Sequence, residues 1–411
     1  MPPALRVPQI SAILLLALAL RLVWALTIPV EPVSDAAAYD IFARNIAGHG
    51  VYGFTPDAPS AYWAVGTAAI YAAAYMAFGA GGLAVVVVNL ASSMAIVWLL
   101  WLLGRRWFDE TTGRLAALIF ALWPLTIQYV TVLASELHFM ALSLAGLWAW
   151  DRARDSGQRW LFLLLSGIFL AAATYIRPIA LLIPATLALA AICRAPRRAG
   201  GPVLRAALVT GLIFALVTPW SLRNERVLGE RAFVSTNFWA NFWMGNHPGT
   251  DGEYAPLPPD VESLGELERA VILRERSLDY LRQAPGAFVT RTLWKAVRLH
   301  RAETIGVAWN RAAIERRAGP AGVTLLRLVS AGYWFAMLAA ALAGVVRLAG
   351  ARGLWQALLA PPVILWIYFT AIHAVIVVGD RYHMPAIPMI ALLAGYALAG
   401  IRIVGRRPAL R

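Results

Sequence analysis

Apolar stretches that approach the length needed to cross a membrane recur along most of the sequence. A transmembrane helix needs about 20 predominantly apolar residues. Ten candidate stretches are residues 9–28, 82–103, 115–133, 136–150, 160–175, 177–193, 206–220, 321–347, 355–378 and 383–402. Charged residues make up only 14% of the chain, whereas soluble domains carry roughly 25%. The sequence therefore predicts a single polytopic, all-α integral membrane domain over residues 1–411, a bundle of about ten transmembrane helices.

The positive charge of the chain is concentrated in short loops between these stretches. The formal net charge is +14, and arginine supplies nearly all of the positive charge. The basic segments are residues 105–114, 151–159, 194–205, 347–352 and 402–411. Loops rich in lysine and arginine stay in the cytoplasm, so we predict a multi-pass protein of the plasma membrane with both termini cytoplasmic. The charge is explained by topology, and we expect membrane lipids as partners and no nucleic acid.

This topology predicts that two longer polar segments face outward. The first periplasmic loop covers residues 29–81, and within it residues 62–78 are apolar enough to span a membrane. Counting them as a span would put the basic loop at 105–114 on the wrong side, so we predict an interfacial helix there. The second segment, residues 221–320, is predicted to form a periplasmic cap with amphipathic helices.

Polar side chains gather at the outward ends of the predicted spans, where burying them in lipid would be costly. They are Arg21, Gln128, Ser135, Glu136, His138, Arg177, Arg223, Asn224, His373, Asp380, Arg381, Tyr382 and His383. In a compact bundle this distribution predicts one outward-facing polar cavity, rich in arginine and poor in acids. Taken singly, Arg223 or Arg381 could instead extend to lipid headgroups, and Glu136 could cap a helix.

Three of these arginines are candidates to bind a phosphate. Arg177 lies in a tight turn before Pro178, so its charge must point into the bundle or toward an anion. Arginine holds phosphate oxygens with two parallel hydrogen bonds and keeps its charge. We therefore predict that Arg177, Arg223 and Arg381 bind an anionic, lipid-linked phosphate.

The first outer loop contains the strongest candidate for a catalytic carboxylate. If residues 36–47 are helical, Asp35 caps the start of the helix, and Asp40 can pair with Arg44 at i,i+4. Asp35 then has no evident partner and is free for chemistry, unless capping is its only role. Five residues apart on a helix, the two aspartates point ~140° away from each other, so they do not form a paired metal site.

No motif of a soluble enzyme or metal site stands out. The sequence has no glycine-rich phosphate loop and no His or Cys spacing suited to zinc. Cys193 is the single cysteine, and His247, His373 and His383 are scattered. We therefore predict neither a metal ion nor an organic cofactor.

Several segments, in order along almost the whole chain, resemble the bacterial branch of the GT-C glycosyltransferases. This group includes the protein O-mannosyltransferases (glycosyltransferase family 39) and the lipid A aminoarabinose transferases. The matching residues are Ala19 to Arg21, Asp35 with Tyr39, Trp63 to Gly79, Arg105-Arg106 with Pro124, Ser135-Glu136, Arg177-Pro178, Pro219 to Asn224, Asn246 to Tyr254, and Arg381-Tyr382 with Pro385 and Pro388.

The resemblance implies an inverting enzyme that transfers a sugar from a polyprenyl-phosphate donor, on the periplasmic side, to a lipid, glycan or protein acceptor. Asp35 falls at the family's catalytic acid position, although Ser34 precedes it where the family often has a second acid. We take Glu136 as the second choice of catalytic residue. The predicted substrate-binding residues are Tyr39, Arg177, Arg223, Asn224, Arg381, Tyr382 and His383.

Two other classes of protein remain compatible with these features. A periplasmic glycan ligase or polymerase would share an outward cavity but would use a diphosphate-linked lipid donor. A lipid or solute transporter would also be polytopic. Many transporters have inverted repeats and a pair of spans broken by glycine or proline in matching halves. The sequence shows neither feature.

Overall fold

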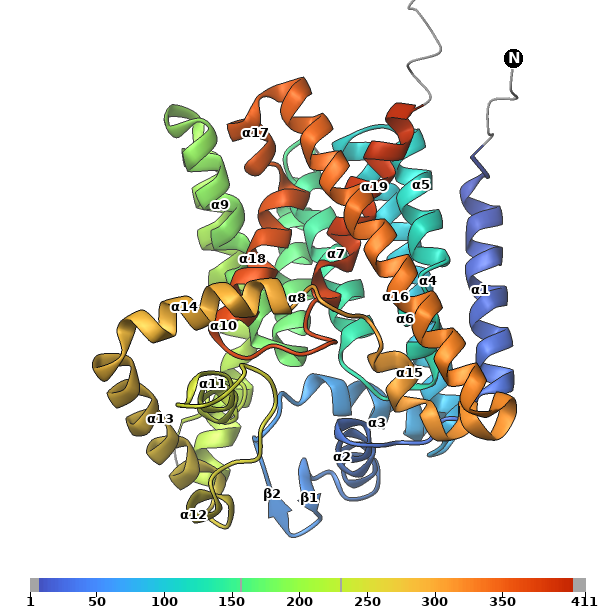
Figure 1. Cartoon of the computed structure of the whole chain (residues 1–411). Helices are drawn as coiled ribbons and strands as arrows, with labels where there is room; N and C mark the ends of the chain where they lie inside the picture. Colours follow the sequence, from blue (N-terminus) through green and yellow to red (C-terminus); the bar gives the residue numbers. More distant parts are fainter. Residues whose placement is uncertain (1–6, 156, 230, 402–411) are drawn as a thin grey trace, which may run out of the picture.

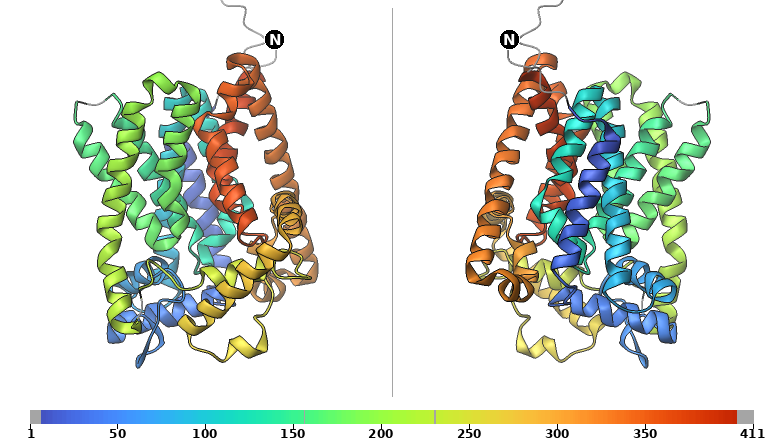
Figure 2. Two further views of the ribbon diagram at one scale, coloured as in Figure 1. Left: turned by 90° about the vertical axis from the view of Figure 1, so that its left-hand side faces the viewer. Right: turned by 90° about the vertical axis from the view of Figure 1, so that its right-hand side faces the viewer.

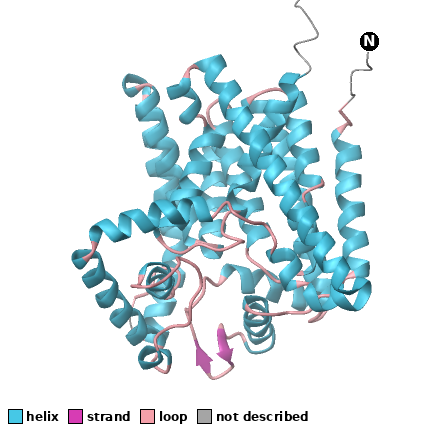
Figure 3. Ribbon diagram, viewed as in Figure 1, coloured by secondary structure: helices cyan, strands magenta, loops and turns pink. Residues whose placement is uncertain are grey.

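The computed structural model describes residues 7–155, 157–229 and 231–401, and it is built almost entirely from helices (Figure 3). A bundle of long helices fills most of the molecule (Figure 1). It comprises α1 (Ile10–Thr27), α4 (Gly82–Trp107), α5 (Glu110–Ala121), α6 (Pro124–Gln128), α7 (Glu136–Arg152), α8 (Arg159–Ile176), α9 (Ile183–Arg194), α10 (Gly200–Leu228), α16 (Arg311–Arg352), α17 (Leu354–Leu358), α18 (Pro361–Val375) and α19 (Ile387–Ile401).

The other α-helices and the two strands gather at one end of this bundle, and together we call them the cap. They are α2 (Asp35–His49), β1 (Gly53–Thr55), β2 (Ala58–Pro59), α3 (Gly66–Phe78), α11 (Phe238–Asn246), α12 (Pro259–Glu262), α13 (Glu266–Gln283), α14 (Pro285–Arg298) and α15 (Ile305–Trp309). The side views in Figure 2 show the same arrangement. The two segments predicted to face outward thus lie together, and the start of α1 and the end of α19 lie at the opposite end.

The membrane character of the chain is confirmed, but the count of ten spans is not. Within the described residues, six helices are long and apolar enough to cross a membrane: α1, α4, α8, α10, α16 and the segment Met384–Ile401 that contains α19. Helices α5 and α6 act as a seventh candidate if they are counted together, although the chain bends by 56° between them. Three predicted spans fall on helices α7, α9 and α18, which are shorter.

The bend between α5 and α6 explains the position of Arg21. A broken helix leaves carbonyl oxygens without partners. From α1, Arg21 donates to the carbonyl oxygens of Phe120 (3.3 Å) and Ala121 (3.1 Å) and to Thr126 Oγ1 (2.9 Å). Arg21 was expected among the residues lining the outward cavity. That expectation is wrong, because its side chain is fully buried inside the bundle, where it hydrogen-bonds the broken helix.

Predictions from local sequence patterns hold in the cap. Arg44 Nε lies 2.8 Å from Asp40 Oδ2 on α2, so the expected i,i+4 pair is confirmed. The apolar segment expected to lie off the bundle forms α3, which sits beside α2 (Figure 1). Whether α3 lies in a membrane interface stays a prediction.

The second half of the cap is attached to the bundle by buried polar contacts. Lys295 on α14 is fully buried, and its Nζ donates to Asn246 Oδ1 (2.9 Å) on α11 and to the carbonyl oxygen of Ile376 (3.2 Å). Ile376 lies in the connection between α18 and α19. In that connection, Asp380 accepts hydrogen bonds from the backbone N–H (2.7 Å) and the hydroxyl (2.8 Å) of Thr304. These contacts hold the connection between α18 and α19 against the cap.

Candidate active site

A cavity of about 340 Å³ lies where the cap meets the bundle. We call it the cap cavity. Its walls come from α2, the turn between α8 and α9, α11, and the connection between α18 and α19. The polar groups that line it are Asp35, Tyr39, Ser135, Arg177, Ser235, Asn237, Asn241, His373, Arg381 and Tyr382, and the aromatic ones include Tyr62, Trp63, Phe233, Phe238 and Tyr254. Segments from across the chain thus form one concave, mixed polar and aromatic site, as ligand sites usually are.

Asp35 and Arg381 form an ion pair on one wall of this cavity. Asp35 is the first residue of α2, and Arg381 lies between α18 and α19. The Arg381 guanidinium also lies over the rings of Trp309 and Tyr382, 5.0 Å and 5.3 Å from their centroids. The side chains of Asp35 and Arg381 keep 27% and 17% of their surface exposed, so both can be reached from the cavity.

The structure corrects two expectations about Asp35. It makes no side-chain capping bond, because the N-cap position of α2 is occupied by Ser34. Asp35 was also expected to have no partner, which is wrong because it pairs with Arg381, 346 positions away in the sequence. Among the described residues, Ser34 is the only one other than glycine with a positive φ, at 53°. Such backbone strain is concentrated at functional sites.

Arg177 forms the second ion pair of the cavity. It follows α8 and precedes Pro178, and its Nε donates to Ser135 Oγ at 2.8 Å. A second nitrogen, Nη2, pairs with the Glu136 carboxylate at the start of α7. The Glu136 side chain is fully buried while Arg177 keeps 13% of its surface exposed. Arg177 therefore faces the cavity, and Glu136 lies behind it without contact to the cavity space.

These two pairs change the expected electrostatics of the site. The sequence predicted a cavity with several arginines and few acids. In the structure, Arg177 and Arg381 are each matched by a carboxylate. The cavity lining holds two arginines and one acid, Asp35, and the two ion pairs reduce the positive charge that these arginines offer to a ligand. Counting charged residues along the sequence cannot reveal which of them meet.

The aromatic side chains that line the cavity include two potential hydrogen-bond donors near the ion pairs. Tyr39 lies one turn along α2 from Asp35, and its ring centroid is 6.0 Å from that of Trp63. Burial, with a contribution from the Asp35 charge, raises the pKa of Tyr39 to about 12, so its hydroxyl stays protonated near neutral pH. Tyr382 stacks on His373 with a centroid distance of 5.1 Å. Both tyrosines are among the predicted substrate-binding residues.

Three predicted substrate-binding residues do not line the cavity. Arg223 on α10 donates to the carbonyl oxygen of Ser60 (2.8 Å), and Asn224 donates to that of Ala232 (3.0 Å). His383 is buried, with its Nε2 3.1 Å from Glu303 Oε1 and its ring 4.3 Å from that of Trp334. In this structure Arg223 ties α10 to the first loop, and His383 belongs to a polar cluster inside the bundle.

Sequence reasoning missed other lining residues, above all Asn237 and Asn241. Asn241 lies on α11, and Asn237 occupies its N-cap position. The two asparagines are four residues apart in the aromatic segment NFWANFW, so they face the same side of the chain. That spacing was a readable signal of a polar spot on an otherwise apolar helix.

A metal-binding cluster was not expected from the sequence. Within residues 7–155, 157–229 and 231–401, no group of three or more His, Cys, Asp or Glu side chains is arranged to hold a metal ion.

A family model described as dolichyl-phosphate-mannose-protein mannosyltransferase matches residues 57–221. This match runs from the first loop into α10, and it includes Ser135, Glu136 and Arg177. No protein with a curated description matches the sequence significantly.

Solved structures with a similar fold include two of the archaeal oligosaccharyltransferase AglB from Archaeoglobus fulgidus. One, in complex with an inhibitory peptide and a dolichol-phosphate, has a TM-score of 0.59 and 14% identity, covering 98% of this chain and 52% of that chain. The other, tethered with an acceptor peptide, has a TM-score of 0.58 and 12% identity. Its match covers 95% of this chain and 49% of that chain. The chain thus spans about half the length of these neighbours.

ArnT from Cupriavidus metallidurans, bound to undecaprenyl phosphate, also matches, with a TM-score of 0.48 and 14% identity over 96% of this chain and 79% of that one. The family model accounts for the middle of the sequence. The AglB comparison accounts for the fold along nearly the whole chain. Both findings support the resemblance to the GT-C glycosyltransferases, the first by sequence over residues 57–221 and the second by fold.

Proposed function

We propose that this chain is a membrane glycosyltransferase that takes a sugar from a polyprenyl-phosphate donor and transfers it, with inversion, to a periplasmic lipid, glycan or protein acceptor. The observation that carries the proposal is the Asp35–Arg381 ion pair in the wall of the cap cavity, with Arg177 exposed to the same cavity. A carboxylate and two guanidinium groups are the functional groups that this transfer needs. The family match and the shared fold support the same class of reaction.

In the proposed reaction Asp35 is the general base. The acceptor oxygen attacks the anomeric carbon of the sugar, and its proton passes to the Asp35 carboxylate. The bond between the anomeric carbon and the phosphate oxygen breaks, and its electron pair leaves with the polyprenyl phosphate. Arg177 and Arg381 stabilise the charge that develops on this phosphate, because fixed cations in a water-poor site need no reorganisation during the reaction.

The ion pair suggests how the donor prepares the base. In the structure Arg381 forms an ion pair with Asp35. A guanidinium has five N–H donors, and it binds phosphate in a bidentate manner. Binding of the donor phosphate to Arg381 therefore competes with Asp35 and leaves the carboxylate free to accept the proton of the acceptor.

Replacing Asp35 with asparagine tests this role. We expect Asp35→Asn to be produced at normal levels and to lose activity by ~10²–10⁴, as removal of a general base does. Activity can be measured by complementation. Deletion of the gene should change the mass of a surface glycan, and the measurement is how far each variant, expressed in the deletion strain, restores that mass. Asp40→Asn is the matched control, because Asp40 lies on the same helix, pairs with Arg44 and is outside the cavity lining.

Binding of polyprenyl phosphate to the purified Asp35→Asn protein gives a second readout. We expect the affinity to be kept or increased, because the carboxylate no longer competes for Arg381. An Asp35→Asn enzyme within a few-fold of wild-type activity would contradict the proposed base.

The proposed mechanism uses arginine in place of a metal ion to stabilise the leaving phosphate. Membranes treated with a chelator should therefore keep their activity. Full loss of activity in chelator, with recovery on adding manganese or magnesium, would instead show that a metal ion stabilises the leaving phosphate.

The second candidate is a ligase or polymerase that uses a diphosphate-linked glycan donor. It is favoured by the similarity of the fold to AglB, which is an oligosaccharyltransferase. The donor consumed in vitro separates the two, because the proposed enzyme uses a monophosphate-linked sugar and leaves a diphosphate-linked glycan intact.

A further inference from the structure

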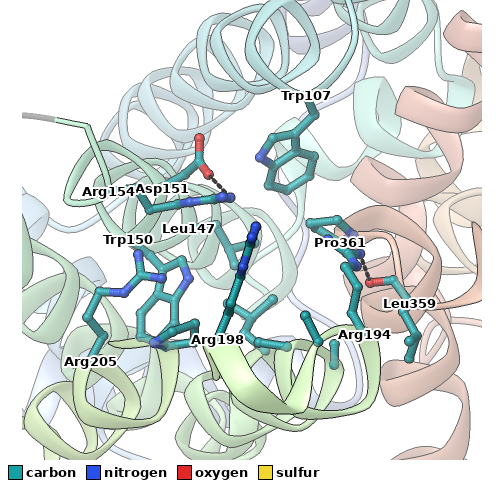
Figure 4. Close-up of a pocket in the computed structure, with 15 residues that line it drawn as sticks. Trp107, Leu147, Trp150, Asp151, Arg154, Arg194, Arg198, Arg205, Leu359 and Pro361 are labelled. Carbon is teal, nitrogen blue, oxygen red and sulfur yellow. Dashed lines mark hydrogen bonds and ion pairs between the residues drawn. The ribbon is translucent and has the colours of Figure 1, made fainter. Parts of the chain in front are cut away.

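A second cavity, of about 210 Å³, lies at the end of the bundle opposite the cap (Figure 4). It is formed by the ends of α7 and α9, the start of α10, and the residues that lead into α18. Four arginines and one carboxylate line it: Arg154, Arg194, Arg198, Arg205 and Asp151. We call it the arginine cavity.

The single carboxylate does not balance these arginines. Asp151 is engaged by Arg106, which comes from α4 and also binds Asp155. Arg154 Nη1 lies 3.5 Å from the other oxygen of Asp151. Arg194 uses one of its nitrogens on the carbonyl oxygen of Leu359 and not on an acid. The cavity therefore keeps an excess of positive charge.

Arg205 gives the most specific indication of a ligand. Its side chain is 8% exposed and lies over the ring of Trp150, 5.1 Å from the centroid. Its Nη1 is buried and has no hydrogen-bond partner among the described residues. A buried charged donor without a partner is costly, so an acceptor is needed at this point of the cavity.

The cavity also borders an apolar part of the outer surface of the bundle. Leu187 and Ala191 of α9 line it, and nearby apolar side chains on the outside of α9 and α10 are exposed, among them Leu189 (58%) and Leu204 (52%). Figure 4 shows Arg154, Arg198 and Arg205 grouped around the cavity. A ligand with an anionic head and an apolar tail fits both features.

We propose that the arginine cavity binds the phosphate of an anionic lipid headgroup, with Arg205 and Arg198 as its main donors. The guanidinium fork matches phosphate oxygens in pairs. The bundle end that carries the cavity also carries the basic loops, and these are predicted to be cytoplasmic. This site is independent of the proposed glycosyl transfer, which takes place at the cap.

Native mass spectrometry of the purified full-length protein tests the proposal. Phosphatidylglycerol, phosphatidylcholine and inorganic phosphate are the three ligands to be added. We expect phosphatidylglycerol to bind more tightly than phosphatidylcholine. Loss of one charge-assisted hydrogen bond weakens binding about tenfold, and we expect this from Arg205→Gln and from Arg198→Gln.

Arg197→Gln is the matched control, because Arg197 is exposed, adjacent to Arg198 and absent from the cavity lining. If burial makes Arg205→Gln unstable, the exposed Arg198 still allows the test. Equal binding of the two lipids, or phosphatidylglycerol binding unchanged by both variants, would overturn the proposal. Binding of inorganic phosphate that displaces the lipid at equal concentration would assign the site to a soluble phosphate and would also overturn it.

Discussion

The two cavities use arginine in opposite ways. In the cap cavity, Arg177 and Arg381 each meet a carboxylate, Glu136 and Asp35. In the arginine cavity, four guanidinium groups face one aspartate that Arg106 already holds. The number of arginines at the two sites therefore says little about how much positive charge each offers to a ligand.

The difference shows what pairing does for a buried cation. An arginine matched by a buried carboxylate is part of the folded structure, because each charge makes burial of the other tolerable. An arginine without such a partner contributes little to folding but remains available to an anion. Substitution of Arg177, whose partner Glu136 is fully buried, should therefore lower stability, whereas substitution of an unpaired arginine should affect ligand binding with little effect on stability.

The largest effect is expected from Arg177→Met. The variant leaves the fully buried Glu136 without its partner, and breaking a buried pair in this way costs about 3–5 kcal/mol. Thermal unfolding of the protein in detergent should show a large fall in the midpoint. The double variant Arg177→Met/Glu136→Gln should recover most of the loss, since no unpaired charge is then left. A single variant as stable as wild type would show that the pair does not contribute to folding.

A smaller effect, on activity and not on folding, is expected from Arg381→Lys. Lysine can keep the charge opposite Asp35 but cannot bind phosphate with a planar fork. Loss of one or two charge-assisted hydrogen bonds lowers the transfer rate by about 10- to 100-fold. The rate at saturating donor is the measurement.

Arg44→Lys serves as the control for Arg381→Lys, because Arg44 is also paired with an aspartate but lies outside the cavity. Equal transfer rates for both variants would show that Arg381 does not bind the donor phosphate.

The smallest effect is expected at the other cavity. Arg198 is exposed, and no ion pair joins it to an acid in the described part of the chain. Arg198→Gln should therefore change the unfolding free energy in lipid-free detergent by no more than about 0.5 kcal/mol. Removing one of several neighbouring positive charges should also make stability less dependent on salt. A clear loss of stability would contradict the contrast between the two cavities.

Short-range relations were predictable from the sequence because neighbours along a helix have fixed positions. Asp40 and Arg44 are one turn apart, and their pair follows from the helix alone. The amphipathic patterns in the cap correspond to α13 and α14. Asp35 lines the cap cavity and has a partner, Arg381, that the sequence did not predict, and its catalytic role stays a prediction.

The sequence by itself determined the class of the molecule. Its apolar stretches require helices that can satisfy their own backbone hydrogen bonds in lipid, and its ordered motifs indicated the GT-C superfamily. Only the tertiary structure decided which charges meet. Arg381 reaches Asp35, Arg177 covers Glu136, and Arg21 turns inward to a broken helix. These contacts join residues from 41 to 346 positions apart, and over such separations partners are chosen by helix packing and not by local sequence.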